Sequence, residues 1–144
     1  MKKITIPCTV ILLILLPVAL VVGCQQPTTP ALPMSGEWTA TTEFGEIGFT
    51  VNPDSTRIAK VSFDFVEFKC GNTQLSGGMS IGSETLWPIT DGQFTIDTSL
   101  GPMTPWDVVI QGEFDQTGTH ASGTWEISSA GEIRSGTWES SPTS

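Results

Sequence analysis

Residues 106–114, WDVVIQGEF, alternate between apolar and polar positions along most of their length. The even-numbered positions hold only apolar residues or glycine, and Asp107, Gln111 and Glu113 occupy odd-numbered ones. A period of two is typical of a β-strand that buries one face, because successive side chains point to opposite sides of the backbone. We therefore predict a strand here, with the side that includes Trp106 and Phe114 in a core.

The same period recurs from residue 36 onward. Glycine, threonine and serine are abundant there, and no window keeps the 3.6-residue period of a helix. Turn-forming sequences, such as NPDS at residues 52–55, separate the runs. The sequence predicts an all-β, antiparallel meander of about eight or nine short strands. The further runs are residues 36–43, 47–51, 57–70, 75–81, 94–98, 121–127 and 133–139, with an edge strand or connector at 86–89 and a loop at 100–105.

The run at residues 57–70 contains a slip in its alternation. Apolar residues occupy the odd positions from 59 to 65 and the even positions from 66 to 70. A β-bulge near Phe65 and Val66 would absorb this slip, because one residue of shift reverses the face on which the following side chains lie. Asp64 and Glu67 flank the expected bulge, and we interpret both as solvated carboxylates.

Glycine is repeatedly followed, two residues later, by an aromatic residue or isoleucine, as at residues 36–38 and 112–114. The two residues share a face, so a small gap lies beside a bulky side chain, as in the interiors of small closed β structures. Consecutive hairpins without long crossovers close most simply into a barrel, which removes exposed edges. We predict a small β-barrel, with a β-sandwich as the alternative, and place Trp38, Trp125 and Trp138 in its core.

The N-terminal residues have the layout of an export signal. Two lysines precede an uncharged apolar segment at residues 4–22, and the sequence VVGC occupies residues 21–24. This ending resembles the lipobox of bacterial lipoproteins. The resemblance implies a diacylglyceryl group on the Cys24 thiol, cleavage between Gly23 and Cys24, and acylation of the new amino terminus by a chain such as palmitate. A transmembrane anchor is the alternative, but two prolines interrupt the run and no basic cluster follows it.

Removal of residues 1–23 would leave 121 residues, enough for one domain with its own core. Residues 24–35 are rich in proline and threonine and predict an extended tether, residues 36–140 a single all-β domain, and residues 141–144 a tail. The mature part carries four basic and fifteen acidic residues, a formal net charge of −11. Nucleic-acid binding is not expected, because so few cations cannot neutralise many phosphates. We predict an extracytoplasmic protein attached through its lipid to the cell membrane, cytoplasmic or outer.

Cysteine usage leaves one thiol in the domain. Cys8 belongs to the signal and Cys24 to the lipid site, so Cys70 has no internal disulfide partner. Unpaired cysteines are commonly buried, and we predict that Cys70 is a small buried hydrophobe rather than a nucleophile.

The domain also resembles a loosely defined group of uncharacterised secreted bacterial β proteins. The resemblance rests on the glycine-x-tryptophan strand at residues 36–38, the phenylalanine-containing strand at 47–51, the mid-chain Cys70, and the closing glycine-x-tryptophan strands at 123–125 and 136–138. It implies an all-β fold and export, and brings no activity. Members often carry a second cysteine near the C-terminal strands, which this chain lacks, so no disulfide is implied.

Few residues suited to catalysis are present. The chain has one histidine, His120, and no tyrosine. No H-E-x-x-H sequence occurs, and the one G-x-S-x-G match, GMSIG at residues 78–82, overlaps the predicted strand at 75–81 and does not lie at a strand-to-helix turn, so we interpret His120 as a solvent-exposed turn residue. No residue spacing typical of a metal site is present either. Asp107, Glu113 and Asp115 could supply a carboxylate pair, but all three fall on the predicted outward face. We predict no catalytic residue, no metal and no cofactor.

Two function classes are compatible with these residues. The first is a non-catalytic binding or interaction module that uses its outward acidic face or its loops against an envelope protein or a glycan. The alternative is a small barrel that holds an apolar or glycan ligand. Trp87 and Trp106 border proline-containing loops and are the predicted ligand contacts of this alternative. A filled interior favours the first class, and an internal cavity favours the second.

Overall fold

The computed structural model describes residues 31–101 and 106–143, without the side chains of residues 83–86. The regular elements in these ranges are β-strands, which confirms the predicted all-β class. The eight strands in the described ranges are β1 (Gly36–Thr42), β2 (Gly45–Val51), β3 (Arg57–Cys70), β4 (Thr73–Pro88), β5 (Gln93–Leu100), β6 (Trp106–Phe114), β7 (Ala121–Ser129) and β8 (Glu132–Pro142).

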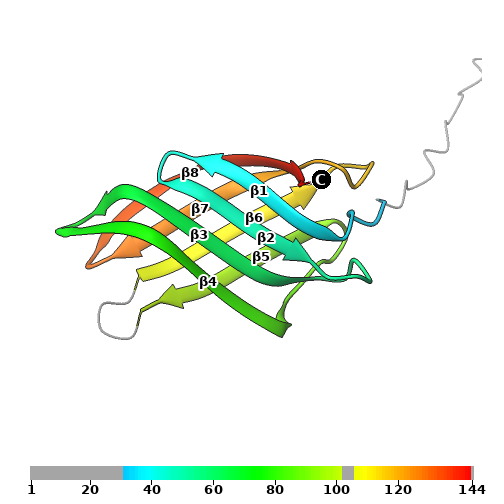
Figure 1. Cartoon of the computed structure of the whole chain (residues 1–144), viewed down its shortest axis with the longest axis horizontal. Coiled ribbons are helices and arrows are strands. Elements are labelled where there is room, and N and C mark those ends of the chain that lie inside the picture. The colour runs from blue at the N-terminus through cyan, green and yellow to red at the C-terminus, as the bar shows by residue number, and fades with distance from the viewer. Residues whose placement is uncertain (1–30, 102–105, 144) are drawn as a thin grey trace, which may run out of the picture.

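The strands form one antiparallel sheet in the order β4-β3-β2-β1-β8-β7-β6-β5. Each strand pairs with the next one along the chain, except that β4 does not pair with β5. β1 and β8 join the two ends of the meander through the pairs Trp38–Pro142 and Thr39–Ser141. Figure 1 shows the sheet curling so that β1 to β4 cross in front of β5, β6 and β7. The predicted barrel-like meander is therefore confirmed, and it is open between β4 and β5.

The strand predicted from WDVVIQGEF is β6, and its side chains alternate as expected. Trp106 and Phe114 are buried at its ends, whereas Asp107, Gln111 and Glu113 are exposed. Buried residues from every strand in the described ranges form one cluster between the two crossing layers. Burial of this apolar surface is the main favourable contribution to folding.

β3 contains the bulge that the sequence predicts. Between the pairs Phe65–Gly77 and Phe68–Leu75, two residues of β3 face one residue of β4. One of the two is Val66, which is 67% exposed. Phe68 is buried, so the bulge returns β3 to the same interior. Val66 lies outside the core because it belongs to the bulge itself.

Several strands extend beyond their predicted ends, and β4 and β8 do so the most. β4 runs to Pro88 at the edge of the sheet, so of the two alternatives predicted for residues 86–89 the edge strand is confirmed and the connector is wrong. Trp87 pairs with Ile58 of β3. A proline is tolerated there because the outer side of an edge strand needs no ladder hydrogen bond. β8 runs to Pro142, beyond the predicted end of the domain at residue 140, because it pairs with β1 there.

Residues 32–34, which we call the strap, cross the end of the barrel just before β1. Pro33 is buried, and its carbonyl oxygen accepts a 2.6 Å hydrogen bond from Oγ of Ser55. The backbone nitrogen of Met34 donates to the carbonyl oxygen of Gly118 at 2.9 Å. The end of the predicted tether is therefore bound to the barrel. The predicted signal peptide, the tether up to residue 30 and the loop at 102–105 lie outside the described residues.

Candidate functional site

Aromatic side chains occupy the interior near the strap. Trp38 packs against Phe49 and Phe114, with ring centroids 5.7 Å and 5.2 Å apart. Trp138 packs against Phe49 at 5.7 Å and against Phe94 at 6.0 Å. Trp38 and Trp138 are 0% and 3% exposed, which confirms their predicted place in the core.

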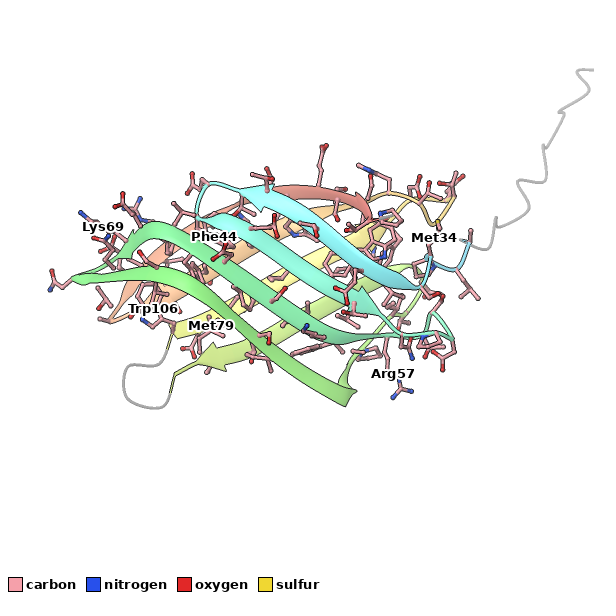
Figure 2. The ribbon with its side chains drawn as sticks, viewed as in Figure 1. Met34, Phe44, Arg57, Lys69, Met79 and Trp106 are labelled. Carbon is pink, nitrogen blue, oxygen red and sulfur yellow. The ribbon has the colours of Figure 1, made fainter. Side chains whose placement is uncertain are left out.

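Phe44, at the tip of the β1–β2 hairpin, fills the interior towards the opposite end. The centroid of its ring lies 4.9 Å from Trp125, 5.1 Å from Phe65 and 5.6 Å from Phe68. Trp106 extends the same group, at 6.1 Å from Phe68. Trp125 is buried, as predicted. Figure 2 labels Phe44 and Trp106 on the side of Lys69, and Met34 at the far end.

Glycines make room for these rings. A Cβ atom on Gly112 would lie 2.5 Å from Cε1 of Phe94 and 2.7 Å from Cζ2 of Trp138. A Cβ atom on Gly136 would lie 2.8 Å from Nε1 of Trp125. Phe94 is the β5 partner of Gly112, and Trp125 is the β7 partner of Gly136. The large side chains that fill the space at these glycines therefore come from other strands, and not from the position two residues later on the same strand, where the sequence predicted them.

Trp87 and Trp106, the predicted ligand contacts, are 4% and 3% exposed. Both rings belong to the continuous core cluster. Their contact with a ligand stays a prediction, and it would require the core to open around them.

Two of the carboxylates considered for catalysis lie far apart. Asp107 and Glu113 are on the same strand, six positions apart, which places their Cα atoms about 20 Å from each other. The two carboxyl groups of a glycosidase lie no more than about 9.5 Å apart. Asp107 also accepts a 2.6 Å hydrogen bond from Oγ of Ser99 on β5. The geometry does not bring these two carboxylates to one point.

Asp115 organises the turn between β6 and β7. Its carboxylate accepts hydrogen bonds from Oγ1 of Thr117 at 2.7 Å and from the backbone nitrogens of Thr119 and His120 at 3.1 Å and 3.2 Å. These donors, above all the Thr117 hydroxyl, lower the pKa of Asp115. A carboxyl group that acts as a general acid at neutral pH needs a raised pKa, and the pKa of Asp115 is lowered instead. Its hydrogen bonds suit it to hold the turn. His120 is half-buried rather than fully exposed, because it lines a depression with residues of β1 and β8 such as Thr39.

The outer face of β5, β6 and β7 carries two parallel rows of polar side chains. Neighbouring strands are about 4.8 Å apart and alternate residues along a strand about 6.8 Å apart, so the rows cover roughly 10 by 7 Å. They line a shallow depression that is open to solvent. The rows, which we call the polar array, are Gln93, Glu113 and Ser122, and Thr95, Gln111 and Thr124, all exposed.

Sequence reasoning found only part of this surface. The alternation placed Gln111 and Glu113 outward, as the structure does. Their alignment with Gln93 and Ser122 depends on the register of two hairpins, which the alternation does not specify. Phe44 was not identified as a core residue either, because it lies in a turn.

Cys70 is 1% exposed, which confirms that it is a buried thiol. Its Sγ donates to the carbonyl oxygen of Glu132 at 3.5 Å. This contact joins the ends of the β3–β4 and β7–β8 hairpins.

Among the described residues, no group of three or more His, Cys, Asp or Glu side chains is placed to hold a metal ion. The same part of the chain contains no helix that is long and apolar enough to cross a membrane. Gly23 and Cys24, the predicted cleavage and lipidation site, lie outside the described residues. No family model, curated protein or solved structure matches the chain.

Proposed function

We propose that this chain is a lipid-anchored extracytoplasmic protein whose barrel is a non-catalytic binding module. Its contact surface is the polar array, and its partner is an envelope protein or a glycan. The observation that carries this proposal is the filled interior, in which aromatic rings from both layers pack against one another. Binding by the barrel is then a property of its outer surface.

A ligand inside the barrel would have to displace packed rings. Trp38, Phe49 and Phe94 are each less than 5% exposed, and their centroids lie within 6 Å of other aromatic rings. Removing a buried aromatic side chain from such contacts costs about 3–5 kcal/mol. The alternative of an internal apolar or glycan ligand therefore gains no support from this packing.

The chemistry of the polar array suits an uncharged polar partner. The amides of Gln93 and Gln111 each donate and accept hydrogen bonds, and hydroxyls such as that of Thr124 do the same. Glu113 is the one charged member of the array. A hydroxyl-rich glycan or an exposed polypeptide segment offers the complementary donors and acceptors, directly or through water.

Photo-crosslinking on intact cells tests the contact surface. A photoreactive residue replacing Gln111 lies within the array, whereas one replacing Ser80 lies at an exposed position on β4 and is the matched control. The proposal predicts one discrete adduct from position 111 and none from position 80. Identical adducts from both positions, or none from position 111, would contradict it.

Metabolic labelling with palmitate tests the anchor. The mature chain has two cysteines, so Cys24→Ser and Cys70→Ser are a matched pair. We expect Cys24→Ser to lose the palmitate label and to retain its uncleaved signal peptide, because no thioether can form at position 24. Cys70→Ser should keep the label. Retention of the label in Cys24→Ser would refute the anchor.

A further inference from the structure

We propose that the barrel stands on the bilayer with the strap end facing the lipid headgroups, and that Leu32 and Met34 contact the bilayer there. This orientation rests on the proposed lipid anchor at Cys24. The partner of this end is the surface of the bilayer that holds the acyl chains. The opposite end, with the β3–β4 and β7–β8 turns, then faces away from the membrane.

The strap is held firmly to the barrel. Besides the bonds to Ser55 and Gly118, the carbonyl oxygen of Met34 accepts a 3.0 Å hydrogen bond from Nε1 of Trp38. Gly118 has φ of 68°, and a Cβ atom there would lie 3.0 Å from the carbonyl carbon of Leu32 and closer still to its oxygen. The chain therefore enters the barrel at one fixed point.

The anchor restricts that point to the neighbourhood of the membrane. Cys24 precedes Leu32 by eight residues, and an extended chain spans at most about 3.6 Å per residue, so the strap lies within about 29 Å of the lipidated residue. β8 connects the far end to the end beside the strap, and its eleven residues span about 34 Å along the strand. Figure 2 shows Met34 and Lys69 at these opposite ends.

The strap end presents apolar side chains to the outside. Leu32 is 71% and Met34 51% exposed, although both are large and apolar. An apolar depression beside them is lined by Ala31, Pro33 and Ile89 among others. Contact with the headgroup and acyl-chain boundary would bury these surfaces, as it does for other interfacial apolar groups.

The charges at this end select the kind of lipid. Asp54, Asp91 and Asp115 lie in the turns around the strap, and Arg57 lies beside the first of these turns. The excess of carboxylates is repelled by anionic headgroups. A zwitterionic surface is therefore the preferred partner.

Fluorescence quenching by headgroup-labelled lipids measures the orientation. The acylated full chain, with Cys70→Ala to leave one reactive thiol, receives a fluorophore at Leu32→Cys, Thr119→Cys, Asn72→Cys or Ala130→Cys and is reconstituted in phosphatidylcholine vesicles that contain a nitroxide-labelled lipid. We expect quenching to be several-fold stronger at positions 32 and 119 than at positions 72 and 130. Equal quenching at all four positions, or stronger quenching at 72 and 130, would overturn the orientation.

Glycine variants test whether the strap sets this orientation. Gly118→Ala introduces a Cβ atom against the strap, whereas Gly131→Ala is strained by a similar φ of 85° but meets nothing within 4 Å. With fluorophores at positions 119 and 72, we expect Gly118→Ala to lose the difference in quenching between the two ends and Gly131→Ala to keep it. An unchanged difference in Gly118→Ala would contradict a fixed strap, and circular dichroism of the same samples reports whether the barrel is folded.

Exposed-residue variants give an independent test that does not depend on folding. Leu32→Ser combined with Met34→Ser is expected to reduce quenching at position 119 several-fold, as is replacement of phosphatidylcholine by phosphatidylglycerol. If quenching at position 119 were unchanged by the double substitution or by the change of lipid, the proposed lipid contact would be contradicted. The intact mass of the reconstituted protein distinguishes a failed orientation from a failed anchor. If the acyl chains are present, equal quenching at the two ends refutes the orientation alone. If the acyl chains are absent, the anchor and the orientation are refuted together.

Discussion

Replacing Gly112 with alanine tests whether the interior is as full as its packing indicates. The added methyl group would lie 2.7 Å from Cζ2 of Trp138 and 2.5 Å from Cε1 of Phe94, well inside van der Waals contact. Both atoms belong to rings, which could in principle turn aside. Phe94 is confined, however, by Phe49 and Phe114, with ring centroids at 5.4 Å from its own in each case.

The expected cost follows from these contacts. Forcing an additional methyl group into a packed core costs about 1–3 kcal/mol. Alanine in a strand regains about 0.5–1 kcal/mol relative to glycine, because it loses less backbone entropy on folding. We therefore expect Gly112→Ala to lower the free energy of unfolding by about 1 kcal/mol, and at most by about 2.5 kcal/mol. A loss of about 1 kcal/mol corresponds to a decrease in Tm of roughly 4 °C for a domain of this size.

Urea unfolding followed by tryptophan fluorescence measures this change, and Gly78→Ala is the matched control. Gly78 is an exposed strand residue, and a Cβ atom there would lie 3.7 Å from the nearest atom, an ordinary contact. We expect the control to be unchanged or more stable by about 0.5–1 kcal/mol. If Gly112→Ala were as stable as Gly78→Ala, the interior would have free volume and the internal-ligand alternative would regain support.

Three further changes have expected outcomes. Phe44→Ala should lower the free energy of unfolding by about 3–5 kcal/mol, because it empties a buried site between three aromatic rings. Val66→Ala, at an exposed residue, should change the free energy of unfolding by less than about 0.5 kcal/mol in the same urea titration. Similar costs for the two variants would be inconsistent with the packing around Phe44. Alkylation of Cys70 should be slow in the native protein and accelerate with urea, since the thiol is 1% exposed, and rapid labelling without urea would show that the hairpin contact opens. The pKa of Asp115 is lowered below its ordinary value of 3.8, chiefly by the Thr117 hydroxyl, so its contribution to stability is complete above pH 3.8 and is lost as the pH falls through the lowered pKa. Asp115→Asn should therefore unfold with a flatter dependence of the urea midpoint on pH in this acidic range, and an unchanged slope would argue against the turn contacts.

The alternation of side chains predicts the strands because it reports a local property, the face on which each side chain lies. WDVVIQGEF becomes β6 with the expected residues buried, and the slip near Phe65 becomes a bulge. The position of Val66 is not predictable from parity, since an apolar residue inside a bulge can face solvent. Trp87 bordered a proline and suggested a loop, but its pairing with Ile58 holds it in the core.

Features that depend on register or on contacts distant in sequence could not be predicted. The polar array exists because two hairpins bring Gln93, Gln111 and Thr124 onto neighbouring strands with matching positions. The strap depends on Gly118, more than eighty residues further along the chain than Met34. Nothing in the local sequence around Met34 specifies that partner, because the contact depends on how the whole barrel places the turn that carries Gly118.

The intact mass of the protein extracted from membranes tests the lipid anchor most directly. The account predicts an amino terminus at Cys24 that carries a thioether-linked diacylglyceryl group, with further acylation of the amine in hosts that perform it. A chain that begins at Met1, or one in which Cys24 is an unmodified thiol, would contradict the anchor and with it the orientation of the barrel on the membrane.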